Sequence, residues 1–137
     1  MALSRFLISE MNRFMENRDF PEISAVTMVP LHWFRYFKRG FNQAEILAQG
    51  VAEHLGVPCI KTLKRRRASS AQALKSRQQR QKNITHIFDV PEKQKLPNGA
   101  ILLIDDVMTT GTTLAACTKA LNEAGVEEVY VLTAARG

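Results

Sequence analysis

The sequence has 137 residues, of which 45% are hydrophobic and 23% charged, a composition typical of one soluble domain with a packed core. No apolar run approaches the ~20 residues of a membrane-spanning helix, and the apolar stretch at the start is too short for a signal peptide. We therefore expect a single cytoplasmic domain over residues 1–137, without insertion into a membrane.

The net charge of +6 is concentrated in one stretch of the chain, residues 64–82. This cationic segment contains eight Lys and Arg residues and no acidic residue, whereas the rest of the chain has eleven basic and thirteen acidic residues. It is also poor in apolar side chains, which predicts low local stability. The pattern indicates either a solvated basic loop or a segment that closes over an anion.

The N-terminal part of the chain predicts a helix, a strand and a loop. Apolar residues recur at helical spacing over residues 3–17, so an N-terminal helix is expected within residues 1–20. Residues 23–29 form an apolar run that ends before a proline, which is typical of a buried strand. Residues 31–41 are aromatic and basic, and we expect them to form a loop.

The middle of the chain predicts a second helix and two short strands. Asn42 is a favourable N-cap for this helix, and Gly56 is expected to end it. Short strands are expected over residues 57–63 and 84–90, on either side of the cationic segment. The two cysteines of the chain match no CxxC or metal-binding spacing, so we expect buried thiols rather than metal ligands.

The C-terminal part predicts a strand, a helix and a strand. Residues 100–104 are a continuous apolar run, as in a parallel strand that is buried on both faces. A helix is expected over residues 112–124 and a last strand over 126–135. The alternation predicts an α/β fold, a parallel β-sheet flanked by helices. The residues expected to face inward on the last helix are Leu114, Ala115, Cys117, Thr118 and Leu121.

The most specific motif joins the apolar strand to the last helix. We expect the strand to stop at two acidic residues and a Thr/Gly loop to follow, at the sheet edge where such folds bind ligands. Loop and helix N–H groups make an anion site, threonine hydroxyls add donors, and glycine lets the anion approach closely. The motif consists of Asp105, Asp106, Val107, Met108, Thr109, Thr110, Gly111, Thr112 and Thr113.

The two carboxylates of this motif identify the ligand further. Two negative charges beside a phosphate site would repel phosphate alone, but carboxylates accept hydrogen bonds from the vicinal hydroxyls of ribose. Asp105 and Asp106 therefore predict a sugar 5'-phosphate as ligand. No Gly-Lys-Ser/Thr sequence follows, so the motif is not a Walker loop. The alternative interpretation is an ordinary strand-to-helix turn with a Thr cap.

The sequence ILLIDDVMTTGTTL resembles the motif with which type I phosphoribosyltransferases bind 5-phosphoribosyl-1-pyrophosphate (PRPP). Together with VPLHWFRYFKRGFNQAEILA and AQALKSRQQRQKNITHIFDV, it resembles the ComF/GntX family of competence-associated proteins. The resemblance implies a Rossmann-like three-layer fold, PRPP as ligand and Mg²⁺ bound as the PRPP chelate. Many members of that family begin with a four-cysteine zinc ribbon, which this sequence lacks.

The same resemblance assigns the pyrophosphate end of PRPP to a second loop. Arg39 and Gly40 lie between a strand and a helix start, where charge and a close backbone approach suit a pyrophosphate. The cationic segment is then interpreted as a mobile lid that excludes water and brings cations to the pyrophosphate. Lys64, Arg65, Arg66 and Arg67 are the lid residues expected to bind pyrophosphate, and Gln72, Leu74, Arg80 and Asn83 match the family pattern.

Two functional interpretations stay open from the sequence. The first is a phosphoribosyltransferase in which Asp105, Asp106 and Arg39 serve catalysis and an unidentified acceptor takes C1 of the ribose. The second is a PRPP- or nucleic-acid-binding accessory module with reduced catalysis, linked to DNA uptake. The aromatic loop 33–41 would stack on single-stranded DNA, line the substrate pocket or form a homodimer contact.

Overall fold

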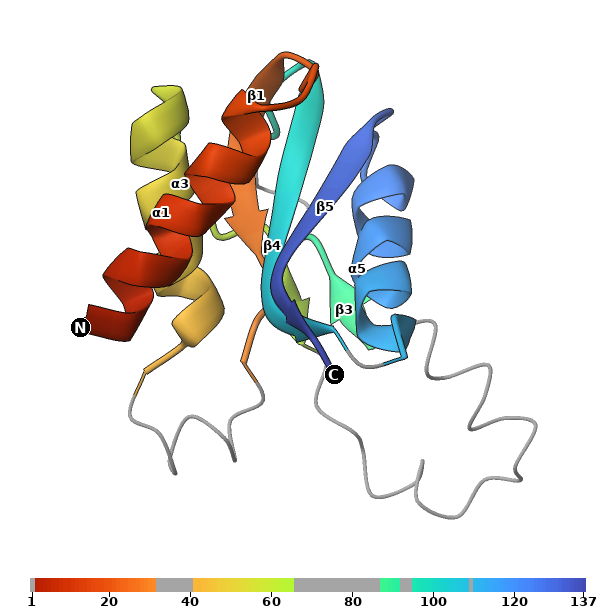
Figure 1. The fold of residues 1–137 in the computed structure, drawn as a ribbon. Helices are drawn as coiled ribbons and strands as arrows, with labels where there is room; N and C mark the ends of the chain where they lie inside the picture. The colour runs from red at the N-terminus through yellow and green to blue at the C-terminus, as the bar shows by residue number, and fades with distance from the viewer. Residues whose placement is uncertain (1, 32–40, 66–86, 92–94, 109) are drawn as a thin grey trace.

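The computed structural model describes residues 2–31, 41–65, 87–91, 95–108 and 110–137. Three long helices and three long strands make up most of this part of the chain (Figure 1). The elements are, in chain order, α1 (Ala2–Glu16), β1 (Ile23–Met28), α3 (Gln43–Leu55), β2 (Lys64–Arg65), β3 (Phe88–Asp89), β4 (Ala100–Met108), α5 (Thr112–Glu123) and β5 (Val129–Arg136).

The main sheet is parallel, with the strand order β1-β4-β5. The expected helices and the three long strands are therefore present, and the α/β fold class is confirmed. Figure 1 shows α1 and α3 on one face of the sheet and α5 on the other, which gives three layers. Because all three strands run in the same direction, their carboxyl ends meet at one edge of the sheet.

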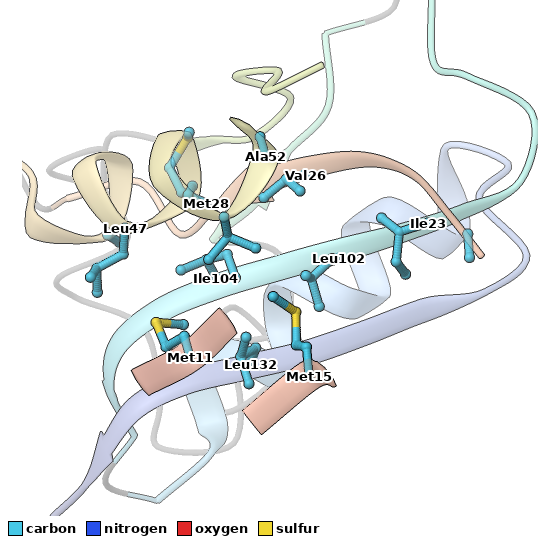
Figure 2. Packing of buried hydrophobic residues seen from close by; sticks show 14 residues of the cluster. Met11, Met15, Ile23, Val26, Met28, Leu47, Ala52, Leu102, Ile104 and Leu132 are labelled. Carbon is cyan, nitrogen blue, oxygen red and sulfur yellow. The ribbon is translucent and has the colours of Figure 1, made fainter. Parts of the chain in front are cut away.

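Strand β4 lies between two hydrophobic cores. Leu102 and Ile104 belong to the core under α1 and α3, and Ile101 and Leu103 belong to the core under α5. All four side chains are fully buried. Figure 2 shows the first core, where Met11 and Met15 of α1 lie with Leu102 and Leu132. Alternate side chains of one strand thus fill both cores, as the continuous apolar run predicted.

The helix boundaries follow their capping residues. Asn42 caps α3, with its Oδ1 accepting a hydrogen bond from the Ala44 N–H at 3.1 Å, and Gly56 ends the helix in the left-handed conformation at φ 69°. Gly125 likewise follows α5 with a positive φ of 101°. The caps at Asn42 and Gly56 were predicted, because cap residues act through local backbone geometry.

The prediction of a strand over residues 57–63 was wrong. This segment makes one isolated bridge, between Val26 and Cys59, with backbone hydrogen bonds from Val26 N–H to Pro58 O and from Ile60 N–H to Val26 O. Pro58 has no N–H, which limits the pairing available to the segment. The segment is instead held by a buried hydrogen bond of 2.8 Å between the Thr27 and Thr62 hydroxyls.

The strand predicted over residues 84–90 is observed only at Phe88–Asp89, which pairs antiparallel with Lys64–Arg65; residues 84–86 lie outside the described part of the chain. Phe88 is buried in the core under α5. On α5, Ala116 and Ala120 are buried in the same core together with Leu114, Cys117 and Leu121. Ala115 and Thr118, which were expected to face inward, lie on the other flank of the helix, beside a shallow groove.

Both cysteines are free thiols, and Cys117 is buried whereas Cys59 is half-buried. Burial is the main cause that raises the pKa of both thiols, to about 12 for Cys117. Both are therefore protonated near neutral pH, as expected of structural cysteines rather than nucleophiles. Within the part of the chain that the structure describes, no helix is both long and apolar enough to cross a bilayer.

The Thr27–Thr62 hydrogen bond gives a test of how the segment before β2 is held. Thr27→Val leaves the Thr62 hydroxyl buried without its partner, so the free energy of unfolding should fall by about 1–3 kcal/mol. Thr62→Val should cost a similar amount. The double variant should recover most of the loss, because neither hydroxyl is then left without a partner. Urea unfolding of the four proteins measures this coupling, and additive losses would contradict it.

Candidate functional site

The acidic pair lies within β4 rather than after it. We expected the strand to stop at Asp105, but β4 continues to Met108 and stays paired with β5 through Asp105↔Thr133, Val107↔Ala135 and Met108↔Arg136. The strand is longer than its apolar run because β5 reaches equally far and supplies backbone partners, which side-chain hydrophobicity does not reveal. The loop between β4 and α5 is correspondingly short.

The carboxylates of the acidic pair are oriented by the backbone that follows each of them. The Asp106 N–H donates to Asp105 Oδ1 at 2.8 Å, and the Val107 N–H donates to Asp106 Oδ1 at 2.9 Å. Both aspartates are half-buried. Asp105 continues the alternation of Ile101 and Leu103 toward α5, and its charge contributes to the raised pKa of Cys117. An ionised carboxylate is a hydrogen-bond acceptor only, the role that a donating sugar hydroxyl requires.

The turn after β4 opens directly into the N-terminus of α5. Gly111 adopts the left-handed conformation at φ 78°, where a glycine is favoured, and its carbonyl accepts the first helical bond from the Ala115 N–H at 2.9 Å. The Thr110 and Thr112 hydroxyls lie 2.9 Å apart, and both residues are exposed. Gly111 offers no side chain to cap the helix. Exposed hydroxyls and a helix N-terminus together suit an anion.

A second helix N-terminus lies at the same edge of the sheet. Asn42 Nδ2 donates to the carbonyl of Val29, the residue just after β1, at 3.3 Å. Val29 in turn donates its N–H to the Ile104 carbonyl at 3.0 Å, immediately before the acidic pair. The start of α3 is therefore tied through β1 to the strand that carries the acids. The sequence identified Asn42 as a cap but gave no signal for this second bond.

Most of the predicted pyrophosphate residues lie outside the described part of the chain. These are Arg39, Gly40, Arg66 and Arg67, and the same holds for Thr109 of the phosphate motif and for lid residues 66–82. Lys64 and Arg65 are described and form β2. The Arg65 guanidinium carbon lies 5.5 Å from the centroid of the Phe88 ring, and its charge acts to lower the pKa of Cys117. Arg65 is therefore on the α5 side of the sheet, as Asp105 is.

The described residues contain no group of three or more His, Cys, Asp or Glu side chains that could hold a metal ion. The fold does contain a strand edge with two carboxylates. Mg²⁺ is commonly bound through one or two carboxylates together with substrate phosphates. The residues present therefore fit a magnesium ion that arrives with a phosphorylated ligand.

Comparison with known proteins gives the class of protein to which this fold belongs. The family described as "Phosphoribosyl transferase domain" matches residues 40–137, so the chain belongs to that family. This result confirms the fold expected from the sequence resemblance.

Curated relatives define the branch of the family. The chain is 37% identical to "Competence protein F" of Haemophilus influenzae over 82% of this chain and 50% of that protein. It is 33% identical to "Competence protein ComFC" of Streptococcus pneumoniae, over 98% of this chain and 55% of that protein. It is 30% identical to "DNA utilization protein YhgH" of Escherichia coli K12, over 95% of this chain and 57% of that protein. The predicted ComF resemblance is confirmed, and the chain spans about half the length of these relatives.

Solved structures with low sequence identity share the fold. Glutamine PRPP amidotransferase from B. subtilis superposes with a TM-score of 0.63 at 21% identity, over 93% of this chain and 26% of that one. A purine phosphoribosyltransferase from Pyrococcus horikoshii gives 0.60 at 15% identity, over 95% and 71%. At these low sequence identities, the similarity shows a shared fold and nothing further.

The two hydrogen bonds of Asn42 can be separated by substitution. Asn42→Ala removes both the helix cap and the bond to the Val29 carbonyl, so it should lower the free energy of unfolding by about 1–2 kcal/mol. Asn42→Asp keeps an oxygen for the Ala44 N–H and loses only the donor. In thermal unfolding, the stability of the Asp variant should therefore lie between those of the parent and the Ala variant. Equal stabilities of all three would show that the α3 start is not held by this side chain.

Proposed function

We propose that the chain binds PRPP at the carboxyl edge of its sheet and transfers the phosphoribosyl group to an acceptor. The observation that carries this proposal is the arrangement of two helix N-termini and an acidic pair at one sheet edge, in a chain of the phosphoribosyltransferase family. Two positive helix ends suit a ligand with two anionic ends. The carboxylates between them suit the sugar.

In this proposal the 5'-phosphate lies against the turn and the first residues of α5. The exposed Thr110 and Thr112 hydroxyls would donate to phosphate oxygens together with N–H groups of the helix start. Asp105 and Asp106 would accept hydrogen bonds from the ribose hydroxyls and so fix the sugar relative to the phosphate. Holding both ends of the sugar orients C1 for displacement, which lowers the entropic part of the barrier.

The pyrophosphate end would face the N-terminus of α3. Arg39 and Gly40 immediately precede Phe41 and the cap Asn42, so their sequence position favours this end of the ligand. As the bond from C1 to pyrophosphate breaks, negative charge grows on the leaving oxygens, and cations aimed at them stabilise the transition state. The cationic segment 64–82 would supply more of these charges as a lid.

Mg²⁺ bound to the phosphates of PRPP would neutralise part of that developing charge. Asp105 and Asp106, which adjoin the proposed phosphate turn, could contact this ion directly or through water. We propose no ion held by protein ligands alone.

A second function is favoured by the names of the relatives. Proteins called competence protein F, ComFC and DNA utilization protein share most of this chain, so an accessory role in DNA uptake is a distinct candidate. In that role PRPP or single-stranded DNA would bind without turnover. Release of pyrophosphate from PRPP on addition of an acceptor would favour the transferase. Salt-sensitive DNA binding without such release would favour the accessory module.

The acidic pair provides the direct test of ligand binding. PRPP with Mg²⁺ at one hundred times its Kd should stabilise the chain by about 2.7 kcal/mol in a thermal unfolding experiment. Asp105→Asn with Asp106→Asn should abolish this shift, because amides replace the carboxylates that accept from the sugar. The double variant alone should melt close to the parent, since removing two like charges relieves repulsion.

Asp19→Asn, an exposed carboxylate beyond the end of α1, is the matched control and should leave the ligand shift unchanged. A double variant that is unfolded without ligand would mean that the acids serve the fold. A parent chain that PRPP does not stabilise would remove the proposed ligand.

The lid hypothesis has its own test. Replacing Arg65, Arg66 and Arg67 with Ala should weaken pyrophosphate binding about tenfold or more, because charge-assisted bonds contribute about 1.5–3 kcal/mol each. Ribose 5-phosphate affinity should not change. Titration calorimetry measures both ligands.

The control replaces Arg13 and Arg18, at and just beyond the C-terminal end of α1, and Lys95, before β4, with Ala, which removes the same net charge. An equal loss in both triple variants would indicate a long-range effect of net charge. A parallel loss of ribose 5-phosphate binding would mean that the segment acts on the whole site.

A further inference from the structure

Strand β5 presents an unprotected edge. Among the described residues, β5 pairs with β4 alone and is the outermost strand of the main sheet. Proteins usually protect such edges with proline, an internal charge, a bulge or a short strand. The eight residues of β5 have no proline, and the sequence VYVLTAA carries no charge before Arg136. It is also rich in β-forming side chains.

The free edge has a defined set of backbone groups. The Glu128 carbonyl accepts a hydrogen bond from the Ile101 N–H of β4 at 3.0 Å. In a parallel pair the backbone groups of alternate residues point to the same neighbour, so the even-numbered residues of β5 face β4. The N–H and carbonyl groups of Val129, Val131, Thr133 and Ala135 therefore point away from β4.

An apolar groove runs beside this edge. It has a volume of about 800 Å³ and is lined by one flank of α5, including Leu114, Ala115 and Thr118, together with Met108 and Val131. The Val131 side chain is 42% exposed, and Val107 nearby is 47% exposed. Free backbone groups next to exposed apolar side chains favour pairing with another strand.

Charges at the two ends of β5 identify the partner. Glu128 and Arg136 lie eight positions apart on either side of Leu132, and both belong to the face on which Tyr130, Leu132 and Ala134 pack toward the core under α1 and α3. The Tyr130 hydroxyl donates to Glu128 Oε2 at 3.1 Å, which holds the carboxylate over that face. An antiparallel strand with the same sequence would set Arg136 opposite Glu128 at both ends.

We propose that β5 pairs antiparallel with β5 of a second copy of this chain, about a two-fold axis at Leu132. In this register the outward-facing residues Val131 and Thr133 of one copy exchange backbone hydrogen bonds with Thr133 and Val131 of the other. Leu132 meets Leu132, Tyr130 meets the small Ala134, and Glu128 meets Arg136. Two three-stranded sheets become one six-stranded sheet, and each groove is covered along its β5 side by the other copy.

The dimer and the proposed ligand site can be tested separately, although Met108 and Gly111 of the phosphate motif also line the groove. Antiparallel pairing directs the carboxyl edges of the two sheets in opposite directions, so each phosphate turn stays complete within its own copy. Loss of the dimer should leave PRPP-dependent stabilisation unchanged. The two proposals can therefore fail separately.

A backbone substitution tests the register. Sedimentation velocity of the 137-residue chain over a range of concentrations should give a dimer. Val131→Pro removes an N–H that points away from β4, so it should preserve the β4 ladder and give a monomer. Circular dichroism and a cooperative melt check that the variant is folded. A native chain that remains monomeric throughout would overturn the proposal and leave the edge to a different occupant.

Charge reversal provides the second test and does not depend on proline being tolerated. Glu128→Arg alone and Arg136→Glu alone should each raise the dimer dissociation constant about tenfold or more, because like charges then face each other at both ends. The double variant Glu128→Arg/Arg136→Glu should restore it to near the parent value. Glu53→Arg, an exposed site on α3, controls for net charge. Single variants that dimerise like the parent, or a double variant without recovery, would contradict the register.

Discussion

The double burial of β4 is the constraint on which the rest of the structure depends. Its alternate side chains fill the core under α1 and α3 and the core under α5, so neither layer can form without it. The same strand continues past its apolar run into Asp105 and Asp106. Any shift of β4 by one residue would exchange the side chains of the two cores. The position of the acidic pair is therefore determined by hydrophobic packing several residues away.

The site gains its electrostatic character from backbone rather than from many charged side chains. The N-termini of α3 and α5 approach the same sheet edge from opposite faces, because parallel strands deliver each following helix to that edge. Asn42 ties one helix to the residue after β1, and Gly111 begins the other with a left-handed turn. Helix ends attract anions at both sides of the edge, while the two carboxylates between them are suited to the neutral hydroxyls of a sugar. This division explains how the acidic pair of β4 and the phosphate site that we propose at the following turn can lie next to each other.

Two surface features lie beside the exposed flank of α5, opposite the side that buries Ala116 and Ala120. One is the groove, and the other is the exposed edge of β5 beside it. The groove lies on the flank opposite the residues that α5 buries, and the edge of β5 is open because, among the described residues, β5 pairs with β4 alone. The surface that we assign to a second copy of the chain adjoins the turn that we propose for phosphate, because Met108 and Gly111 belong to that motif and also line the groove.

The sequence by itself determined the elements whose signals are local. Helix caps at Asn42 and Gly56, the doubly buried run 100–104 and the Thr/Gly turn could each be predicted, because capping, hydrophobic pattern and glycine conformation act within a few residues. The tertiary structure alone decided the length of β4 past the acids, how residues 57–63 are held and the buried flank of α5. Each of these depends on a partner far away in the chain: on how far β5 extends, on the Thr27–Thr62 bond and on Phe88. A periodic pattern shows that a segment has an apolar face, but only the packed neighbours decide which residues complete it.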